Sequence, residues 1–205
     1  MYLHAPAPAG TVGAMTERVR VLCVCTHNRT RSVMMAGLLG NRLAELGLAG
    51  DVASVGFRSA GEPPTEQTVR LLSDRGIDAS AHRSRTIDAE FAGSFDLVLT
   101  AEAAHVVQLA GAKPDLFART FTLPEFVARA ERTGNRSGLT VGEWVDKLGA
   151  DRPIGLDYLD AIDGGLIGEV ADPTGRGMHD WATAIDTIDR LTATLAQQLV
   201  ARDVV

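Results

Sequence analysis

Hydrophobic positions along the chain fall into two patterns, short unbroken apolar runs and longer stretches with helical spacing. The unbroken runs are rich in β-branched residues, which predicts buried strands. They cover residues 19–24, 51–57, 95–101 and 118–123. After the first run, apolar residues recur at helical spacing from Met35 to Leu46, and Gly47 predicts the end of that helix.

Further helices are predicted behind each later strand, at residues 65–75, 102–110 and 124–132. Strands that alternate with helices join in parallel, because each helix carries the chain back along the sheet. The pattern therefore predicts an α/β fold, a three-layer sandwich with a central parallel sheet of about four strands flanked by helices.

The last third of the chain is less regular. Residues 141–149 have helical spacing, whereas residues 151–177 are rich in Gly, Asp and Pro, which predicts a long surface connection. Residues 178–199 predict an amphipathic final helix. A chain of 205 residues fits one domain, here residues 18–205, and residues 1–17 are expected to be a flexible tail without signal-peptide features.

Composition narrows the possible partners. The net charge is −6 and no basic stripe is present, which argues against nucleic acid or an anionic membrane surface as a partner. No apolar run approaches the roughly 20 residues that a membrane span needs, so no membrane insertion is expected. The two cysteines, Cys23 and Cys25, lie two apart on one predicted strand and are expected to be free thiols, which favours a cytoplasmic location.

The segment "CTHNRTRS" joins the first predicted strand to the first predicted helix. Successive backbone N–H groups in such a turn can converge on one anion, assisted by the positive end of the helix dipole. Arg31 adds a planar fork that can bind two phosphate oxygens, and the same field favours the thiolate form of Cys25. Ser32 can donate a hydroxyl hydrogen bond to that sulfur. The segment therefore predicts a phosphate-binding loop with a nucleophilic cysteine after the first strand.

Several motifs in order resemble the low-molecular-weight protein tyrosine phosphatase family. They are C-x5-R-S at residues 25–32, "SAG" at 59–61, "GIDASAHRSR" at 76–85, "FDLVLTAEAAH" at 95–105 and "ADPTG" at 171–175. By this resemblance Cys25 attacks phosphorus, Arg31 holds the phosphoryl oxygens, and Asp172 is the general acid and base. Asn28 would brace the loop, with Ser59 hydrogen-bonded to it. The phosphate would be bound by the whole loop, Thr26, His27, Asn28, Arg29, Thr30, Arg31 and Ser32.

The resemblance also implies a substrate and excludes a cofactor. The expected substrate is a phosphorylated protein, with phosphotyrosine hydrolysed through a phosphocysteine, or a small phosphomonoester. Inorganic phosphate would be product and inhibitor, and no metal or cofactor is needed. The sequence departs from the family at His27, where glycine is usual, and at Thr174 and Gly175, where aromatic residues often line the phenol slot. These departures put the phosphotyrosine preference in question.

Two other functions remain open at this stage. The pattern C-x-H-N-x-x-R-S-x-M also resembles arsenate reductases of the same fold that use a small thiol such as mycothiol, although these do not require an Asp-Pro acid. A non-catalytic oxyanion-binding relative is the other alternative. His82, Arg83 and Arg85 are expected to lie on a solvated face or to pair with nearby carboxylates, and His105 is expected to be an ordinary surface or helix residue.

Overall fold

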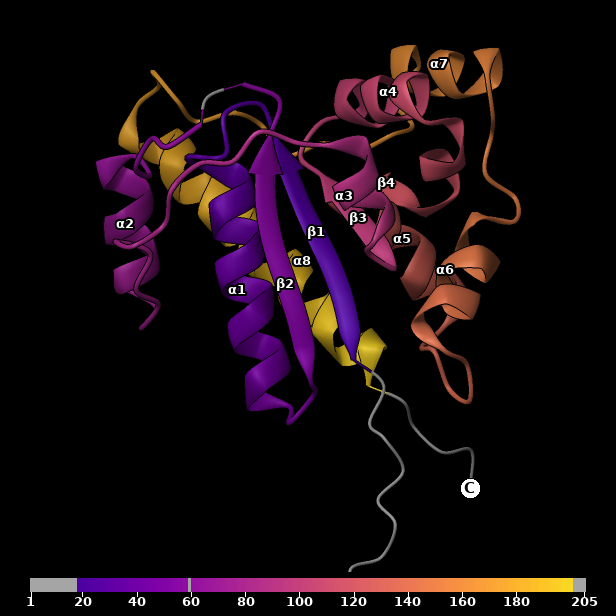
Figure 1. Cartoon of the computed structure of the whole chain (residues 1–205), viewed down its shortest axis with the longest axis horizontal. Helices are drawn as coiled ribbons and strands as arrows, with labels where there is room; N and C mark the ends of the chain where they lie inside the picture. Colours follow the sequence, from indigo (N-terminus) through magenta and orange to yellow (C-terminus); the bar gives the residue numbers. More distant parts are fainter. Residues whose placement is uncertain (1–17, 59, 201–205) are drawn as a thin grey trace, which may run out of the picture.

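The computed structural model describes residues 18–58 and 60–200, which form a four-stranded sheet with helices on both faces (Figure 1). The strands are β1 (Val19–Cys25), β2 (Gly50–Gly56), β3 (Leu97–Thr100) and β4 (Thr120–Thr122). Every pairing is parallel, and the order is β2-β1-β3-β4. The predicted α/β sandwich and its four parallel strands are confirmed.

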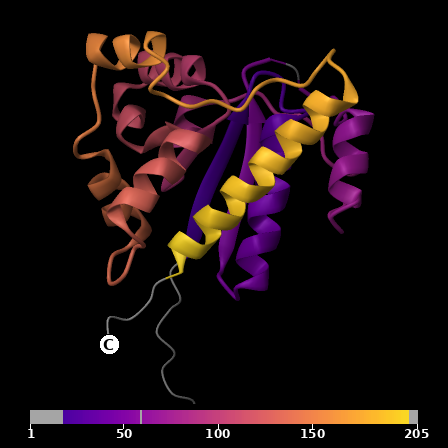
Figure 2. The ribbon, with the colours of Figure 1, turned by 180° about the vertical axis from the view of Figure 1, so that it is seen from behind.

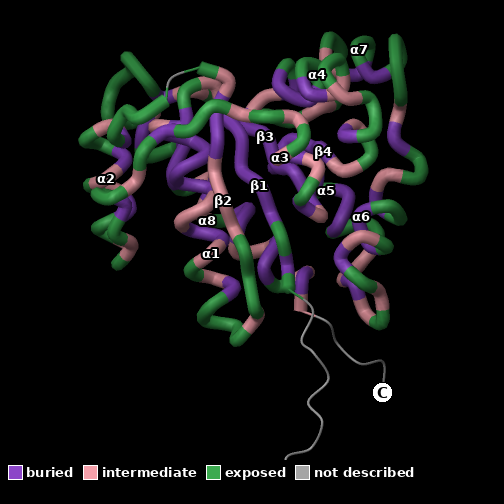
Figure 3. Tube along the Cα trace, viewed as in Figure 1, coloured by how far each residue is buried: buried purple, intermediate pink, exposed green. Residues whose placement is uncertain are grey.

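The burial of the central strand β1 on both of its faces explains why its sequence is almost continuously apolar. Val21 and Cys23 point into a core on one face of the sheet, and Leu22 and Val24 point into a second core on the other face. Because alternate side chains of a strand point to opposite faces, a strand covered on both sides needs apolar residues at every position. Figure 3 accordingly shows most of β1 as buried.

The helices divide between the two faces of the sheet. On one face, α1 (Arg31–Glu45) packs against α8 (Met178–Leu199), which Figure 2 shows crossing the sheet. The core of this face also includes side chains from α5 (Leu123–Thr133) and α6 (Val141–Gly149). The opposite face is covered by α3 (Ala89–Gly93), α4 (Ala103–Ala112) and the 3-10 helix η1 (Pro114–Arg119), while α2 (Glu66–Ser73) packs beside α1.

The Gly-, Asp- and Pro-rich stretch 151–177 is only partly the surface connection that was predicted. It contains the helix α7 (Leu156–Asp163), whose Tyr158 and Ala161 are buried. The phenol ring of Tyr158 packs edge-on against Phe117 of η1, with ring centroids 5.2 Å apart. Long-range packing of one aromatic residue therefore stabilises a helix that its polar composition does not predict.

A buried ion pair supports the same region. Arg152 donates to both carboxylate oxygens of Glu125, at 2.7 and 3.0 Å, and its guanidinium lies over the rings of Phe117, Phe121 and Tyr158. The hydroxyl of Tyr158 also lies 3.3 Å from Glu125, and burial raises the pKa of Tyr158 to about 12. This network fixes the start of α7 to η1 and α5.

Replacing Arg152 with methionine is expected to lower the free energy of unfolding by about 3 kcal/mol, because the carboxylate of Glu125 would stay buried without its main partner. Urea denaturation measures the loss. The matched control is Arg20→Met: Arg20 pairs with Asp96 at the surface, so its loss should cost less than about 1 kcal/mol. Equal losses in the two variants would show that the buried network contributes no special stability.

Both cysteines are free thiols, as expected, and both are buried. Within residues 18–58 and 60–200, no helix combines the length and the apolarity needed to cross a membrane. The predicted flexible tail, residues 1–17, lies outside the described residues.

Candidate active site

The predicted phosphate loop runs from the last residue of β1, Cys25, to the first turn of α1, which contains Arg31 and Ser32. Because β1 ends and the 15-residue helix α1 begins within six positions, the N–H groups of the loop lie at the positive end of the helix dipole. The Sγ of Cys25 lies 3.0 Å from the Oγ of Ser32, within hydrogen-bond distance. The hydroxyl is thus placed to stabilise a thiolate.

The other thiol has a different environment. Cys23 lies two residues earlier on β1 and is completely buried, and this burial raises the pKa of its thiol. Cys23 therefore stays protonated and inert at neutral pH. Of the two sulfurs, only Cys25 lies beside the loop.

Asn28 lies in the middle of the loop and makes several hydrogen bonds to it and to its surroundings. Its backbone has φ of +53°, a left-handed conformation that asparagine tolerates better than most residues. Its side chain donates to the Oγ of Ser32 at 3.0 Å and to the Oγ of Ser54 at 2.9 Å, and accepts from the backbone N–H of Arg85 at 2.8 Å. The ring Nε2 of His82 lies 2.9 Å from the carbonyl oxygen of Asn28.

The sequence does not indicate Ser54, His82 or Arg85 as partners of Asn28. Ser59, the predicted partner, lies outside the described residues, and the side-chain amide of Asn28 donates to Ser32 and Ser54. The expectation that His82 belongs to a solvated face is wrong, because this half-buried ring contacts the loop backbone. Arg85 does keep an exposed side chain, but its backbone N–H also contributes to the brace.

Gly56, at the end of β2, is a second missed residue. A Cβ atom at this position would lie 2.7 Å from the backbone N of Asn28 and 2.9 Å from the carbonyl O of Thr26. The loop therefore packs directly on the glycine backbone, which leaves no room for a side chain. The signal in the sequence was a glycine at the carboxyl end of a strand next to the predicted phosphate loop.

The side chain of Arg31 is buried, with 2% of its surface exposed, and meets two carboxylates. One terminal nitrogen donates to Glu102 and to the carbonyl oxygen of Val170, the latter at 3.1 Å. The other donates to Asp172 at 2.8 Å. The fold thus brings the predicted acid Asp172 to the predicted arginine across 141 positions of sequence.

The segment that carries Asp172 crosses the carboxyl edge of the sheet. The carbonyl of Gly168 accepts from the hydroxyl of Thr122 at the end of β4, at 2.6 Å. The N–H of Val170 donates to the carbonyl of Ala101, just after β3, at 2.9 Å. Two residues further on, Asp172 reaches Arg31 beside β1. These hydrogen bonds fix the position of the acid relative to the loop.

Glu102 and His105, at the start of α4, were not predicted as site residues. His105 is buried and stacked on Phe57, and its Nε2 lies 3.3 Å from the hydroxyl of Thr26 and 4.0 Å from Glu102. Burial lowers the pKa of His105, against the opposing effect of the Glu102 carboxylate. His105 does lie on a helix, which was one of the two predicted settings, but it is buried and not at the surface, and the imidazole is expected to be neutral at pH 7.

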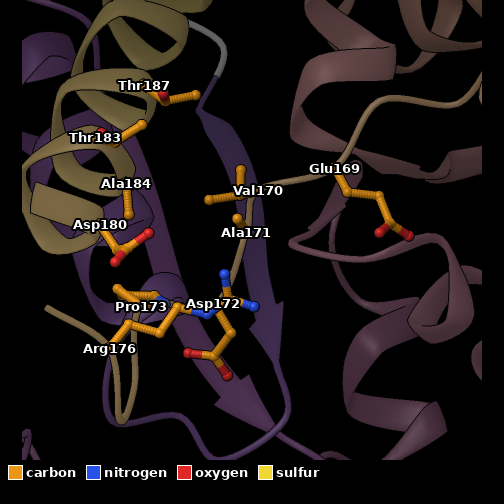
Figure 4. A pocket seen from close by; sticks show the side chains of 10 residues that line it. All are labelled: Glu169, Val170, Ala171, Asp172, Pro173, Arg176, Asp180, Thr183, Ala184 and Thr187. Atoms are coloured by element: carbon orange, nitrogen blue, oxygen red, sulfur yellow. The ribbon is translucent and has the colours of Figure 1, made fainter.

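A cavity of about 250 Å³ adjoins Asp172 on the side of α8. Figure 4 shows Thr183 and Thr187 of α8 across from Val170 and Ala171, while Glu169 points away from α8. The lining includes the carboxylates of Asp172 and Asp180 and the guanidinium of Arg176, but no aromatic residue. Within the described parts of the chain, no group of three or more His, Cys, Asp or Glu side chains could hold a metal ion.

Comparisons with known proteins agree with this geometry. The family model described as "Low molecular weight phosphotyrosine protein phosphatase" matches residues 20–135. The chain is 28% identical over 182 residues to the protein-arginine-phosphatase of Geobacillus stearothermophilus, covering 88% of this chain and 95% of the relative. It is 28% identical over 112 residues to the low molecular weight protein-tyrosine-phosphatase Etp of Escherichia coli, covering 54% of this chain and 73% of Etp.

Solved structures give the same result. The low molecular weight protein tyrosine phosphatase of T. tengcongensis superposes with a TM-score of 0.65 at 26% identity, covering 89% of this chain and 99% of the other. A YwlE mutant of Bacillus subtilis superposes with a TM-score of 0.66 at 24% identity, covering 89% and 97%. Because the identity to this YwlE mutant is only 24%, that similarity supports the fold alone.

Proposed function

The chain belongs to the low molecular weight phosphotyrosine protein phosphatase family and is a cysteine-based phosphatase, and on this premise we propose that it dephosphorylates side chains of proteins through a phosphocysteine at Cys25. The observation that carries the proposal is the meeting of Cys25, Arg31 and Asp172 at one loop, although Asp172 lies far outside that loop in sequence. The free thiols favour a cytoplasmic location.

In the first step the thiolate of Cys25 attacks phosphorus, and the bond between phosphorus and the leaving oxygen breaks. Ser32 stabilises the thiolate, and Arg31 with the loop N–H groups binds the equatorial phosphoryl oxygens. Asp172, protonated in this step, gives its proton to the leaving group. The phosphoryl dianion of the substrate would compete for Arg31 with the carboxylates of Glu102 and Asp172.

In the second step the Asp172 carboxylate takes a proton from water, and the water oxygen attacks phosphorus. The bond between sulfur and phosphorus breaks, and inorganic phosphate and the Cys25 thiolate are formed. Splitting the hydrolysis into two displacements replaces one difficult step with two easier ones. Asp172 gives one proton to the leaving group in the first step and takes another from water in the second, so the residue returns to its protonated starting state.

The leading candidate substrate is phosphotyrosine, the substrate of the family. A second candidate is phosphoarginine. The carboxylates of Asp172 and Asp180 in the cavity would suit a cationic guanidine leaving group, Arg176 in the same lining partly offsets their charge, and no aromatic residue lines the cavity. The similarity over most of the chain to a relative named a protein-arginine-phosphatase agrees with this candidate. Comparing kcat/KM for one peptide carrying either phosphorylated residue would decide between them.

Replacing Asp172 with asparagine is expected to lower kcat for aryl phosphates at least about tenfold, because the leaving oxygen would depart without a proton. The loss should be smaller for para-nitrophenyl phosphate than for phenyl phosphate, since nitrophenolate is the better leaving group. Arsenate reduction needs no such proton. An asparagine variant with unchanged turnover of both esters would contradict the role of Asp172 as the acid.

Replacing Glu102 with glutamine is expected to tighten inhibition by inorganic phosphate about fivefold, because a carboxylate that competes for Arg31 and repels the dianion is removed. The inhibition constant against para-nitrophenyl phosphate measures the effect. Glu169→Gln is the matched control: the carboxylate of Glu169, from the segment after α7, accepts from the N–H of Ala103 at the start of α4, but none of the hydrogen bonds of the Arg31 guanidinium is to Glu169. Weaker phosphate binding in Glu102→Gln would mean that Glu102 positions Arg31 instead of competing for it.

A further inference from the structure

Helix α7 and the residues around it expose an unusual number of large apolar side chains. Of the seven exposed large hydrophobic residues among those described, four lie between positions 154 and 166. They are Ile154, Leu156, Leu159 and Leu166, with exposed fractions of 68%, 77%, 41% and 80%. Single exposed apolar residues need no explanation, but a group of this kind on one short segment marks an interaction surface.

The outward face of α7 is also acidic. Leu156, Leu159, Asp160 and Asp163 follow the spacing i, i+3, i+4, i+7, which places them on one face of the helix. Asp157 is exposed as well, and the helix carries no basic residue. Figure 3 shows much of α7 as exposed. We call this leucine- and aspartate-bearing face, together with Ile154 and Leu166, the α7 surface.

The α7 surface lies at the same edge of the sheet as the phosphate loop. Figure 1 shows α7 at the end of the molecule toward which the strands point. The segment after α7 contacts β4 at Gly168, then β3 at Val170, and reaches Arg31 beside β1 at Asp172. The segment from Gly168 to Asp172 thus spans two strand spacings, about 10 Å, and connects the α7 side of the sheet to the phosphate loop.

We propose that the α7 surface binds the polypeptide that flanks the phosphorylated residue of a substrate protein, and that the preferred flanks carry aliphatic and basic side chains. Aliphatic side chains would pack against Leu156 and Leu159, and lysine or arginine would pair with Asp160 and Asp163. The inference rests on the proposed function. It adds the sequence preference that phosphate binding at Cys25 does not provide, because the phosphate loop recognises the phosphoryl group alone.

Two phosphotyrosine heptapeptides test the proposal, one with leucine and arginine on each side of the phosphotyrosine and one with glutamate in place of arginine. The wild type is expected to have the higher kcat/KM for the arginine peptide. Leu156→Ser/Leu159→Ser should lower that value about fivefold to tenfold. Asp160→Lys/Asp163→Lys should reverse the preference between the peptides. Turnover of para-nitrophenyl phosphate should be unchanged in both variants, since this ester has no flanking chain.

Leu46→Ser is the control, because Leu46 is an exposed leucine that follows the far end of α1. The proposal is overturned if this variant loses as much peptide turnover as the α7 variants, or if the wild type does not distinguish the two peptides. It is also overturned if sedimentation shows a dimer that Leu156→Ser/Leu159→Ser dissociates, since the surface would then bind a second copy of the chain. Absence of para-nitrophenyl phosphate turnover in the wild type would instead refute the proposed function and this inference with it.

Discussion

The Cys25→Ser variant is expected to lose at least about 10³-fold in kcat for para-nitrophenyl phosphate, because a serine hydroxyl at neutral pH is not ionised and cannot replace a thiolate as nucleophile. The substitution removes one polarisable sulfur and adds no volume, so the loop and its brace through Asn28 should persist. Binding of inorganic phosphate, measured by calorimetry, should therefore survive the loss of turnover.

Cys23→Ala is the control for this prediction. Cys23 lies on the same strand, two residues away, and its side chain is buried in the hydrophobic core. Its replacement is expected to keep kcat within about threefold of the wild type, with a modest loss of stability. If Cys25→Ser retained activity, or if Cys23→Ala lost it as completely, the assignment of the nucleophile would be wrong.

The second large effect is expected from Arg31→Lys, which should lower kcat about 10²-fold to 10³-fold although the positive charge is kept. A guanidinium presents two parallel N–H donors to two phosphoryl oxygens, whereas an ammonium group is a single point donor. Loss of one preorganised donor at a transition-state oxygen has an effect of this size in other enzymes. Single-turnover kinetics would separate the effect on chemistry from the effect on phosphate binding.

Arg29→Lys provides the comparison within the same loop. Arg29 donates through Nε to the carbonyl of Pro63 at 2.7 Å, so its side chain is directed to the neighbouring loop and not to Asp172 or Glu102. Its replacement is expected to lower kcat less than about tenfold. Equal losses in the two variants would mean that the loop needs only positive charge and that the bidentate geometry of Arg31 is unimportant.

The strand–loop–helix unit around Cys25 could be predicted because its information is local. A continuous apolar run gives β1, the spacing of Cys25, Arg31 and Ser32 gives the loop, and helical periodicity gives α1. The four-strand parallel sheet follows from the alternation of such units. Asp172 was found through its family resemblance, and the structure then brings it to Arg31.

The rest of the site depends on contacts between distant parts of the chain. Ser54, His82 and Arg85 meet Asn28 across 26, 54 and 57 positions, and nothing in their local sequence indicates which of them will reach the loop. Glu102 is the N-cap residue of α4, and acidic residues are common at the start of helices. Nothing in the sequence therefore indicates that Glu102 contacts Arg31. Helix α7 was missed for the same reason, because its stability comes from the packing of Tyr158.

Detection of the covalent intermediate tests the central claim most directly. The Asp172→Asn variant, mixed with para-nitrophenyl phosphate and denatured within its first turnover, should carry one phosphoryl group on the peptide that contains Cys25. Phosphorus NMR of the denatured protein should show a phosphorus–sulfur bond, and EDTA should not change its yield. A phosphoryl group on His27, or hydrolysis with no phosphorylated protein at any time, would contradict the phosphocysteine mechanism.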